Sequence, residues 1–294
     1  MLRRVLLGLL LVVLLGGGFL WWRVYRLDAE EVRPGLWMLT GVGGNVGVLV
    51  TNEGVVVVDT MTFVRQGEKI LERIAKITDQ RVMAVLNTHY HLDHTHGNPA
   101  FLPGTRVLAT TRTLQHLRER DADFWRDEPA RRLLPNTTFE TTQEIALGGR
   151  TVRLLHPGRG HTDGDLVVLF VEDRVLQAGD LFSNGVYPNI DLEAGGTVRE
   201  WGDTLDRVLA LDFDTVIPGH GPISDRAGLV RFQTFIRSLW TQTSAIATRG
   251  GSRDEALSAV DLASFGLRPL WFAPYLNRRF VIRRAYEEAT GTAG

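Results

Sequence analysis

Apolar and polar positions repeat along this chain with two different periods, which predict strands and helices in two successive blocks. In the first block, short apolar runs rich in β-branched residues predict the strands 36–40, 46–51, 55–59, 82–87 and 106–109. Apolar residues at helical spacing predict the helices 64–77 and 111–120. The turn Asn52-Glu53-Gly54 between two β-branched runs is typical of a hairpin.

The second block repeats this mixture and closes the chain with helices. It predicts the strands 151–155, 166–171, 174–177 and 215–217 and the helices 198–211, 226–248 and 279–290. In both blocks, strands end in residues that can bind a metal ion. The pattern therefore indicates an α/β (α+β) fold of two β-rich halves, with helices outside and a functional site at the seam.

The N-terminus departs from this globular pattern. Residues 5–22 are an uncharged run of 18 residues, long enough to cross a bilayer as a helix. Trp21 and Trp22 end the run where interfacial aromatic residues are common. The alternative is a cleavable signal peptide with a weak cleavage site at residues 16–18, and a mature chain that starts near Phe19 would identify it.

Both interpretations of the N-terminus predict an exported protein. The chain would be anchored in the inner membrane and face the periplasm or cell exterior, or it would be secreted after cleavage. We therefore expect residues 1–27 to be a membrane anchor or signal segment and residues 28–294 to be one globular domain.

Composition narrows the chemistry. The chain of 294 residues has no cysteine, which excludes disulfides, thiolate catalysis and thiolate metal ligands. The formal net charge is −1, and the only lysines are Lys69 and Lys76. This balance argues against a nucleic-acid partner and favours a small-molecule substrate. It predicts no oligomeric state.

The densest group of candidate ligands follows the predicted strand 82–87. Three histidines and one aspartate lie within six residues, in the order His89, His91, Asp93 and His94. Neutral imidazoles and carboxylates are the ligands that zinc and similar ions prefer. The sequence therefore predicts a metal site at the end of this strand.

Three further candidates lie beside strands of the second block. His161 precedes a strand, whereas Asp180 and His220 each follow one. Each residue alone is a weak signal, because single histidines and aspartates are common in turns. In this order after the first motif, they resemble the metallo-β-lactamase superfamily, and the resemblance covers roughly residues 33–225.

This resemblance implies a four-layer αββα sandwich with two metal ions at the edge of its two sheets. By the family pattern, His89, His91 and His161 hold the first ion, Asp93, His94 and His220 hold the second, and Asp180 bridges both. Two Zn²⁺ ions are expected, with iron or manganese as alternatives. Asp93 is also expected to orient the nucleophile or to pass a proton to the leaving group.

The implied activity is hydrolysis by residues 28–294 as the catalytic domain. A metal-bridging hydroxide would attack a small ester, thioester, lactone or amide, with β-lactams among the amides. Efficient β-lactam hydrolysis is in doubt, since no cysteine ligand is present and no lysine follows Lys76. The bridging aspartate and the segment 184–191 resemble glyoxalase II-like enzymes and exported hydrolases associated with quinoprotein systems.

Two alternative activities share these motifs. One is a mononuclear iron oxidoreductase similar to persulfide dioxygenases, which would use mainly the first ligand set. The other is a metal-dependent phosphodiesterase, since two-metal sites also suit phosphoryl transfer. The neutral charge balance argues against long nucleic acids as its substrate.

Three other histidines, two loop segments and a C-terminal aromatic cluster lie outside the candidate ligand set. We expect His96 to orient a ligand or to be a loop residue, and His116 and His156 to be structural or exposed. The glycine-rich turn 41–45 suggests a flexible flap, and the irregular segment 121–136 a pocket wall or a surface connection. Three aromatic residues near the C-terminus could cap the pocket, contact a partner or belong to the core, and we expect them in the core: Trp271, Phe272 and Tyr275.

Overall fold

The computed structural model describes residues 16–18 and 24–292. Most of the predicted anchor or signal segment, residues 1–27, therefore lies outside the residues described. Among those that are described, no helix combines the length and apolar character needed to cross a membrane. The anchor and the signal peptide both remain predictions.

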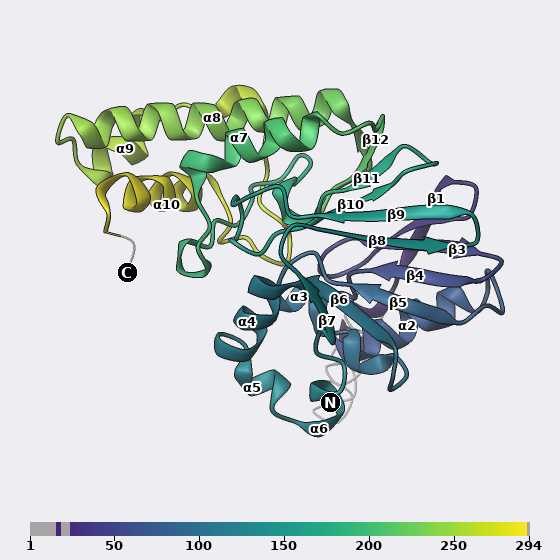
Figure 1. The fold of residues 1–294 in the computed structure, drawn as a ribbon. Helices are drawn as coiled ribbons and strands as arrows, with labels where there is room; N and C mark the ends of the chain where they lie inside the picture. Colours follow the sequence, from purple (N-terminus) through teal and green to yellow (C-terminus); the bar gives the residue numbers. More distant parts are fainter. Residues whose placement is uncertain (1–15, 19–23, 293–294) are drawn as a thin grey trace, which may run out of the picture.

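Two β-sheets form the centre of the fold, as the two predicted blocks required (Figure 1). The first sheet has its strands in chain order: β1 (Asp28–Arg33), β2 (Leu36–Thr40), β3 (Val46–Thr51), β4 (Gly54–Val58), β5 (Val82–Leu86), β6 (Arg106–Thr110) and β7 (Thr137–Phe139). Strands β1 to β4 pair antiparallel, and β4 to β7 pair parallel. Because parallel strands run in the same direction, their C-terminal ends lie at one edge of the sheet, and the first ligand motif follows β5 at that edge.

The second sheet contains strands only from the second block. Its strands also lie side by side in chain order: β8 (Thr142–Leu147), β9 (Arg150–Leu155), β10 (Val167–Phe170), β11 (Val175–Gln177), β12 (Thr215–Ile217) and β13 (Ser224–Asp225). Strands β11 and β12 pair parallel, and the other neighbours pair antiparallel.

Helices cover the outer face of each sheet, which gives the four layers implied by the resemblance (Figure 1). The α-helices are α2 (Val64–Ile74), α3 (Leu92–Thr95), α4 (Thr111–Glu119), α5 (Ala122–Trp125), α6 (Glu128–Arg131), α7 (Val198–Leu209), α8 (Arg226–Thr248), α9 (Arg253–Ala259) and α10 (Arg278–Thr290). The described residues also form four short 3₁₀ turns: η1 (Asn98–Ala100), η2 (Gly179–Leu181), η3 (Leu192–Ala194) and η4 (Ala263–Phe265).

The hydrophobic core is divided by the two sheets. One cluster, which includes Leu49, Val58 and Phe170, fills the space between the sheets. A second cluster, with Ile70 and Val85, joins the first sheet to α2. Because these strands are apolar on both faces, they read as continuous apolar runs in the sequence.

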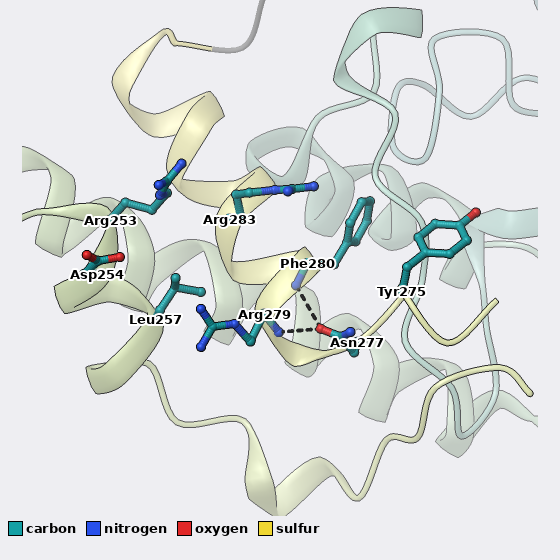
Figure 2. Close-up of a pocket in the computed structure, with 8 residues that line it drawn as sticks. All are labelled: Arg253, Asp254, Leu257, Tyr275, Asn277, Arg279, Phe280 and Arg283. Atoms are coloured by element: carbon teal, nitrogen blue, oxygen red, sulfur yellow. Dashed lines mark hydrogen bonds between the residues drawn. The ribbon is translucent and has the colours of Figure 1, made fainter.

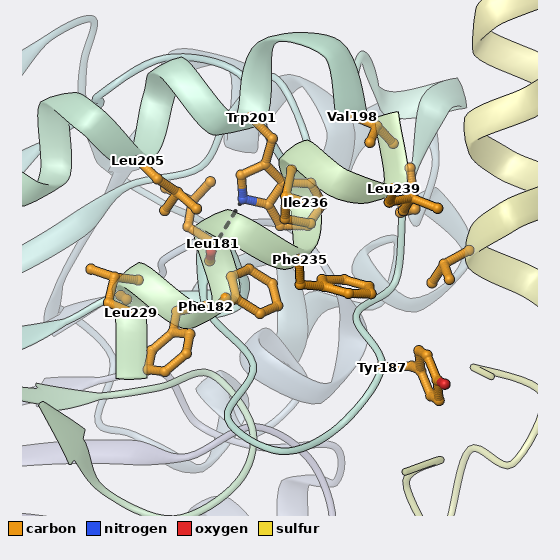
Figure 3. Packing of buried hydrophobic residues seen from close by; sticks show 14 of the residues in the cluster. Leu181, Phe182, Tyr187, Val198, Trp201, Leu205, Leu229, Phe235, Ile236 and Leu239 are labelled. Carbon is orange, nitrogen blue, oxygen red and sulfur yellow. Dashed lines mark hydrogen bonds between the residues drawn. The ribbon is translucent and has the colours of Figure 1, made fainter. Parts of the chain in front are cut away.

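The largest cluster joins the second sheet to α7, α8 and α10 (Figure 3). Trp201 is fully buried there, and its indole Nε1 donates to the Leu181 carbonyl at 3.1 Å (Figure 3). Leu181 follows the candidate ligand Asp180 in η2. The packing of α7 therefore fixes the backbone beside a candidate ligand.

The structure differs from the prediction mainly at sheet edges. Strands β1, β7, β8 and β13 were not predicted, and β1 carries three acidic residues in six. Edge strands tolerate such polar sequences, which hide the apolar pattern of a strand. The helix predicted over 64–77 ends at Ile74 and continues only as a tight turn.

Candidate metal centre

The first ligand motif spans the short loop after β5, which holds His89 and His91, and the helix α3, which holds Asp93 and His94. Strand β5 ends at Leu86, and α3 is a single turn with His91 as its N-cap residue. Asn98 braces this loop from behind: its Nδ2 donates to Asn87 Oδ1 at 2.9 Å and to the Leu133 carbonyl at 3.1 Å. The loop therefore presents its histidines from a rigid base.

The other three candidates reach the same edge from the second sheet. His161 precedes β10, Asp180 lies in η2 directly after β11, and His220 follows β12. The structure thus brings together all seven candidates predicted from the sequence, in two adjoining groups. The site exists only where the two halves of the chain meet.

The first group contains His89, His91, His161 and Asp180. His91 Nδ1 lies 3.1 Å from His89 Nε2 and 2.8 Å from His161 Nε2. The Asp180 Oδ2 atom lies 3.7 Å from His161 Nε2. The candidate ligand atoms of this group all lie within 4.8 Å of one another.

The second group contains Asp93, His94 and His220, and it meets the other oxygen of Asp180. Asp180 Oδ1 lies 3.3 Å from His94 Nε2 and 3.4 Å from His220 Nε2. Asp93 Oδ2 lies 3.3 Å from His220 Nε2. The two oxygens of Asp180 therefore face different groups, as a bridging carboxylate requires.

The outer nitrogens of four histidines have acceptors, which leaves one free nitrogen per ring. Two acceptors are carboxylates: Asp191 Oδ2 lies 2.9 Å from His91 Nε2, and Asp59 Oδ2 lies 2.8 Å from His94 Nδ1. The two others are Thr88 Oγ1, at 3.0 Å from His89 Nδ1, and the Asn189 carbonyl, at 3.0 Å from His161 Nδ1. Such acceptors fix the tautomer in which the other nitrogen can bind a metal ion.

The buried atoms at the centre fit a metal ion. In this tautomer, lone pairs of His89, His91 and His161 face one another, an arrangement that only a cation stabilises. His94 Nε2 and Asp180 Oδ1 are buried without a hydrogen-bond partner among the described residues. Buried polar atoms without partners are rare and call for a specific explanation. Coordination of a divalent ion by each group would satisfy them.

The electrostatics of the two groups agree with this assignment. Burial lowers the pKa of His161 to about 4 and also lowers the pKa of His89, so that both rings are neutral near pH 7. Burial opposes protonation of His220, yet the carboxylates of Asp180 and Asp93 raise its pKa to about 9. A bound cation would supply the positive charge that these carboxylates otherwise draw from a proton.

Two glycines allow the second group to pack this closely. A Cβ atom on Gly44 would lie 2.2 Å from the His94 ring, and one on Gly219 would lie 2.0 Å from Asp180 Oδ1. Gly44 belongs to the turn 41–45, which we expected to be a flexible flap. That expectation was wrong: residues 42–45 are buried, and the amide of Asn45 donates to the Gly219 carbonyl at 2.7 Å.

Sequence reasoning missed the acceptors Asp59 and Asp191. Asp59 is fully buried at the end of β4, where Thr88 also donates to its carboxylate from both N and Oγ1 at 2.8 Å. The hydroxyl of Tyr90 donates to Asp191 Oδ2 at 2.5 Å. The sequence feature that pointed to Asp59 was its position at the end of an apolar strand. In the structure this strand, β4, pairs with β5, which carries the first ligand motif.

The remaining histidines have structural partners. His96 Nε2 lies 2.7 Å from Asp121 Oδ2, and its ring stacks on Phe124 at 3.5 Å. His116 Nε2 lies 2.6 Å from Asp163 Oδ1. Among the described residues, the side chains of His96, His116 and His156 form no hydrogen bond or ion pair with the seven candidate ligands. Of the two roles expected for His96, the structure therefore favours that of a loop residue, and His116 is structural, as expected.

A cavity of about 360 Å³ opens beside Asp93, Asp180 and His220. It is mainly apolar, and its other lining residues are Val42, Thr62, Phe63, His91, Leu92, Asn189, Leu270, Phe272, Ala273, Tyr275 and Leu276. The segment 121–136 does not line it; that segment forms α5 and α6 and packs around Trp125. We call residues 268–277, which close one side of the cavity, the C-terminal wall.

The C-terminal wall corrects another prediction. Trp271 is 54% exposed and Tyr275 is 64% exposed, so neither belongs to the core. Phe272 and Tyr275 instead line the cavity at the candidate metal centre. The wall is attached by backbone hydrogen bonds between Tyr187 N and the Arg268 carbonyl and between Arg268 N and the Gly185 carbonyl, both 3.1 Å. An aromatic cluster in sequence does not reveal whether other elements cover it.

Known proteins share both the sequence pattern and the fold. A metallo-beta-lactamase type 2 from Bacillus sp. (strain 170) is 25% identical over 215 residues, which cover 69% of this chain and 80% of the relative. A linear primary-alkylsulfatase from Pseudomonas sp. (strain ATCC 19151) is 24% identical over 287 residues, covering 81% of this chain and 54% of the relative. Among solved structures, a stereoselective inverting sec-alkylsulfatase from Pseudomonas sp. superposes with a TM-score of 0.70 at 16% identity, over 89% of this chain and 50% of that chain.

The family match covers the whole ligand set. The sequence profile of the Metallo-beta-lactamase superfamily matches residues 39–220. This range contains all seven candidate ligands and ends at the last of them, His220. The solved structure shows the shared fold, and the named relatives support hydrolase chemistry at the general level. Since the profile matches more than half of the chain, this protein belongs to the metallo-β-lactamase superfamily.

Proposed function

We propose that this protein is a dinuclear, zinc-dependent hydrolase. His89, His91 and His161 would hold one ion, Asp93, His94 and His220 would hold the other, and Asp180 would bridge them. The observation that carries the proposal is the position of Asp180, whose two oxygens face the two groups separately. When bound, two such ions would supply Lewis acidity and lower the pKa of a shared water molecule towards neutrality.

The protein's own residues would contribute orientation, proton transfer and exclusion of water. Asp93 borders the cavity beside His220, where its carboxylate can orient the attacking water or pass a proton to the leaving group. Asp191 fixes the ring of His91, and Asp59 fixes the ring of His94. The apolar cavity keeps bulk water away from the reacting groups, which strengthens electrostatic interactions there.

We propose an ester, thioester, lactone or amide as the substrate, with an apolar group beside the cleaved bond. The cavity at the metal centre is lined by no lysine or arginine in the described part of the chain. A carboxylate close to the cleaved bond, as in a β-lactam, would therefore lack a cationic partner in the cavity. This feature supports substrates that carry no charge next to the cleaved bond over β-lactams.

A second candidate is an alkyl sulfate ester. The named alkylsulfatase match covers 81% of this chain, whereas the named β-lactamase match covers 69%. The chain spans about half the length of the alkylsulfatases, so their activity is only a candidate here.

The test combines metal analysis with a substrate panel. Purified protein is stripped with a chelator, reloaded with zinc, and assayed on esters, thioesters, lactones, β-lactams and alkyl sulfates. We expect two zinc ions per chain and hydrolysis that needs zinc. His89→Ala should lose one ion and lower kcat/KM by at least about 100-fold, because the first group then keeps too few ligands.

Arg118→Gln is the matched control, since Arg118 is exposed on α4 and lines neither the metal centre nor its cavity. A protein without bound transition metal, or a His89→Ala variant with full activity, would contradict the proposal. Iron with oxygen uptake on a persulfide would instead favour the mononuclear oxidoreductase.

A further inference from the structure

A second cavity shares Tyr275 with the cavity at the metal centre, and Figure 2 shows the residues that line it. It has a volume of about 670 Å³, is formed by α9 and α10, and is lined by Arg253, Asp254, Leu257, Tyr275, Asn277, Arg279, Phe280 and Arg283. Three arginines and one aspartate give it a net charge of +2. We call it the arginine cavity.

The arginines of this cavity have few partners of their own. In the described part of the chain, Arg253 and Arg279 form no side-chain hydrogen bond or ion pair. Arg283 lies over the ring of Phe280 at 5.5 Å, and its Nε is 3.6 Å from Glu287 Oε1. Arg279 and Arg283 are four residues apart on one face of α10, where like charges repel.

Two other arginines of α10 show the contrast. Arg278 Nη1 donates to the Leu257 carbonyl at 2.8 Å, and Arg284 Nε donates to the Ile190 carbonyl at 3.0 Å. These two side chains hold α10 against its neighbours. Arg279 and Arg283 donate no hydrogen bond to a neighbouring element among the described residues, and both line the arginine cavity. Guanidinium groups that line one cavity suit a ligand with negative charge.

Tyr275 connects this cavity to the metal centre. Its side chain lines both cavities, and its ring lies 6.2 Å from the ring of Phe280 (Figure 2). The C-terminal wall gives the cavity at the metal centre an apolar lining through Leu270, Phe272 and Leu276. A single molecule that reaches from one cavity to the other would meet a metal centre, an apolar surface and then three guanidinium groups.

We propose that the substrate is an anionic amphiphile. Its cleaved bond would lie at the metal centre, an apolar spacer would lie against the C-terminal wall, and a distal carboxylate or phosphate would bind in the arginine cavity. Guanidinium groups bind both anions in a bidentate manner. This inference rests on the proposed hydrolase function, and it assigns the specificity-determining residues Arg253, Arg279 and Arg283.

The chemistry of the cleavage is ordinary hydrolysis. The acyl C–O bond breaks, the oxygen of water forms the new bond to the acyl carbon, and the alcohol leaves with one proton. No oxidant or further reactant is needed. The arginines would take no part in bond breaking, because they hold only the distal end of the substrate.

The test uses 4-nitrophenyl monoesters of dicarboxylic acids of increasing length, each compared with the same ester capped as its methyl ester. At the length that spans both cavities, we expect the charged ester to have about tenfold higher kcat/KM than the capped ester. The double variant Arg279→Gln/Arg283→Gln should lose this preference, and Arg118→Gln should keep it. Phosphate-terminated esters distinguish a phosphate from a carboxylate.

Two outcomes would overturn the proposal: equal kcat/KM for charged and capped esters at every length, or a preference that survives in the double variant. Metal content of each variant reports correct folding independently of the assay. If no ester is hydrolysed at all, the proposed hydrolase function fails instead. Calorimetric titration with nonanedioate then still tests the arginine cavity, with at least about tenfold weaker binding expected for the double variant.

Discussion

The metal-binding edge and the C-terminal wall face the same cavity, yet they are built in opposite ways. At the edge, His89, His94 and His161 are almost completely buried, and each ring has a hydrogen-bond acceptor behind it. On the wall and the adjoining α10, Tyr275 and Arg279 are exposed, and Arg279 has no side-chain partner in the part of the chain described.

This difference suggests that the metal-binding edge carries the chemistry of the site and that the C-terminal wall carries its substrate specificity. The ligands are fixed by contacts from both sheets, so their geometry tolerates little change. The wall contributes the exposed Tyr275 and the half-buried Phe272 to the lining of the cavity beside Asp93. It also lies outside the matched family region of residues 39–220. The edge therefore supports the chemistry shared by the superfamily, and the wall is where a substrate preference of this chain can reside.

The largest expected effect comes from Gly219→Ala, which tests how little change the metal-binding edge tolerates. The added methyl group would lie 2.0 Å from Asp180 Oδ1 and 2.6 Å from the backbone carbon of Gly179, so Asp180 must move. We expect one or both metal ions to be lost and kcat/KM to fall by at least about 100-fold. Metal analysis and ester hydrolysis measure both effects.

Gly266→Ala is the matched control for this substitution. Gly266 has a φ of +64°, but no atom lies within 4 Å of its added carbon. The alanine should cost about 1 kcal/mol of stability and leave metal content unchanged. If Gly219→Ala keeps two ions and full activity, the edge is more adaptable than its packing indicates.

A smaller effect is expected from Asp191→Asn, which weakens the support behind one ligand without touching the metal directly. The amide keeps the shape of the side chain but accepts more weakly from His91 Nε2 and Tyr90 Oη. We expect about 10-fold to 100-fold lower metal affinity, since changes to such acceptors typically have that effect. Competition with a chromophoric chelator measures the affinity.

Tyr90→Phe serves as the control, because it removes only the second donor to Asp191 and leaves the His91 contact in place. The phenylalanine variant should retain most of the metal affinity. Equal losses in the two variants would mean that Asp191 acts by holding the loop and not by orienting His91.

The sequence predicted which residues gather at the candidate metal centre because they follow local rules. Four of them lie within six residues, and the other three flank predicted strands. The helices 226–248 and 279–290 were also predicted nearly residue for residue, and both begin after an N-cap side chain, Asp225 or Asn277, that accepts hydrogen bonds from the first turn. Local pattern was sufficient wherever burial and periodicity agreed.

The acceptors and the wall could not be predicted in this way. Asp191 lies 100 residues from His91, and Asp59 lies 35 residues from His94, so no spacing rule connects them. The aromatic residues of the C-terminal wall were assigned to the core because hydrophobicity alone does not show which element covers a side chain. Both features depend on how the two halves pack.

The smallest effect on metal binding is expected from Arg284→Met, which tests whether α10 and the C-terminal wall influence the metal-binding edge. Arg284 of α10 is buried; its Nε donates to the Ile190 carbonyl, beside Asp191, and its Nη1 donates to Glu287 Oε2 at 2.9 Å. Arg284→Met removes these contacts while keeping an unbranched side chain. We expect a loss of about 1–3 kcal/mol in the free energy of unfolding, since the Ile190 carbonyl loses its charged donor.

The effect of Arg284→Met on the metal centre decides the comparison. If the loop of residues 189–193 is held mainly by its own contacts with His161 and Tyr90, metal affinity should fall by no more than about threefold. Chemical denaturation and chelator competition, measured on the same variant, separate stability from affinity. A loss of affinity as large as that of Asp191→Asn would show that α10 positions His91 through this loop, and the C-terminal region would then belong to the catalytic machinery as well as to specificity.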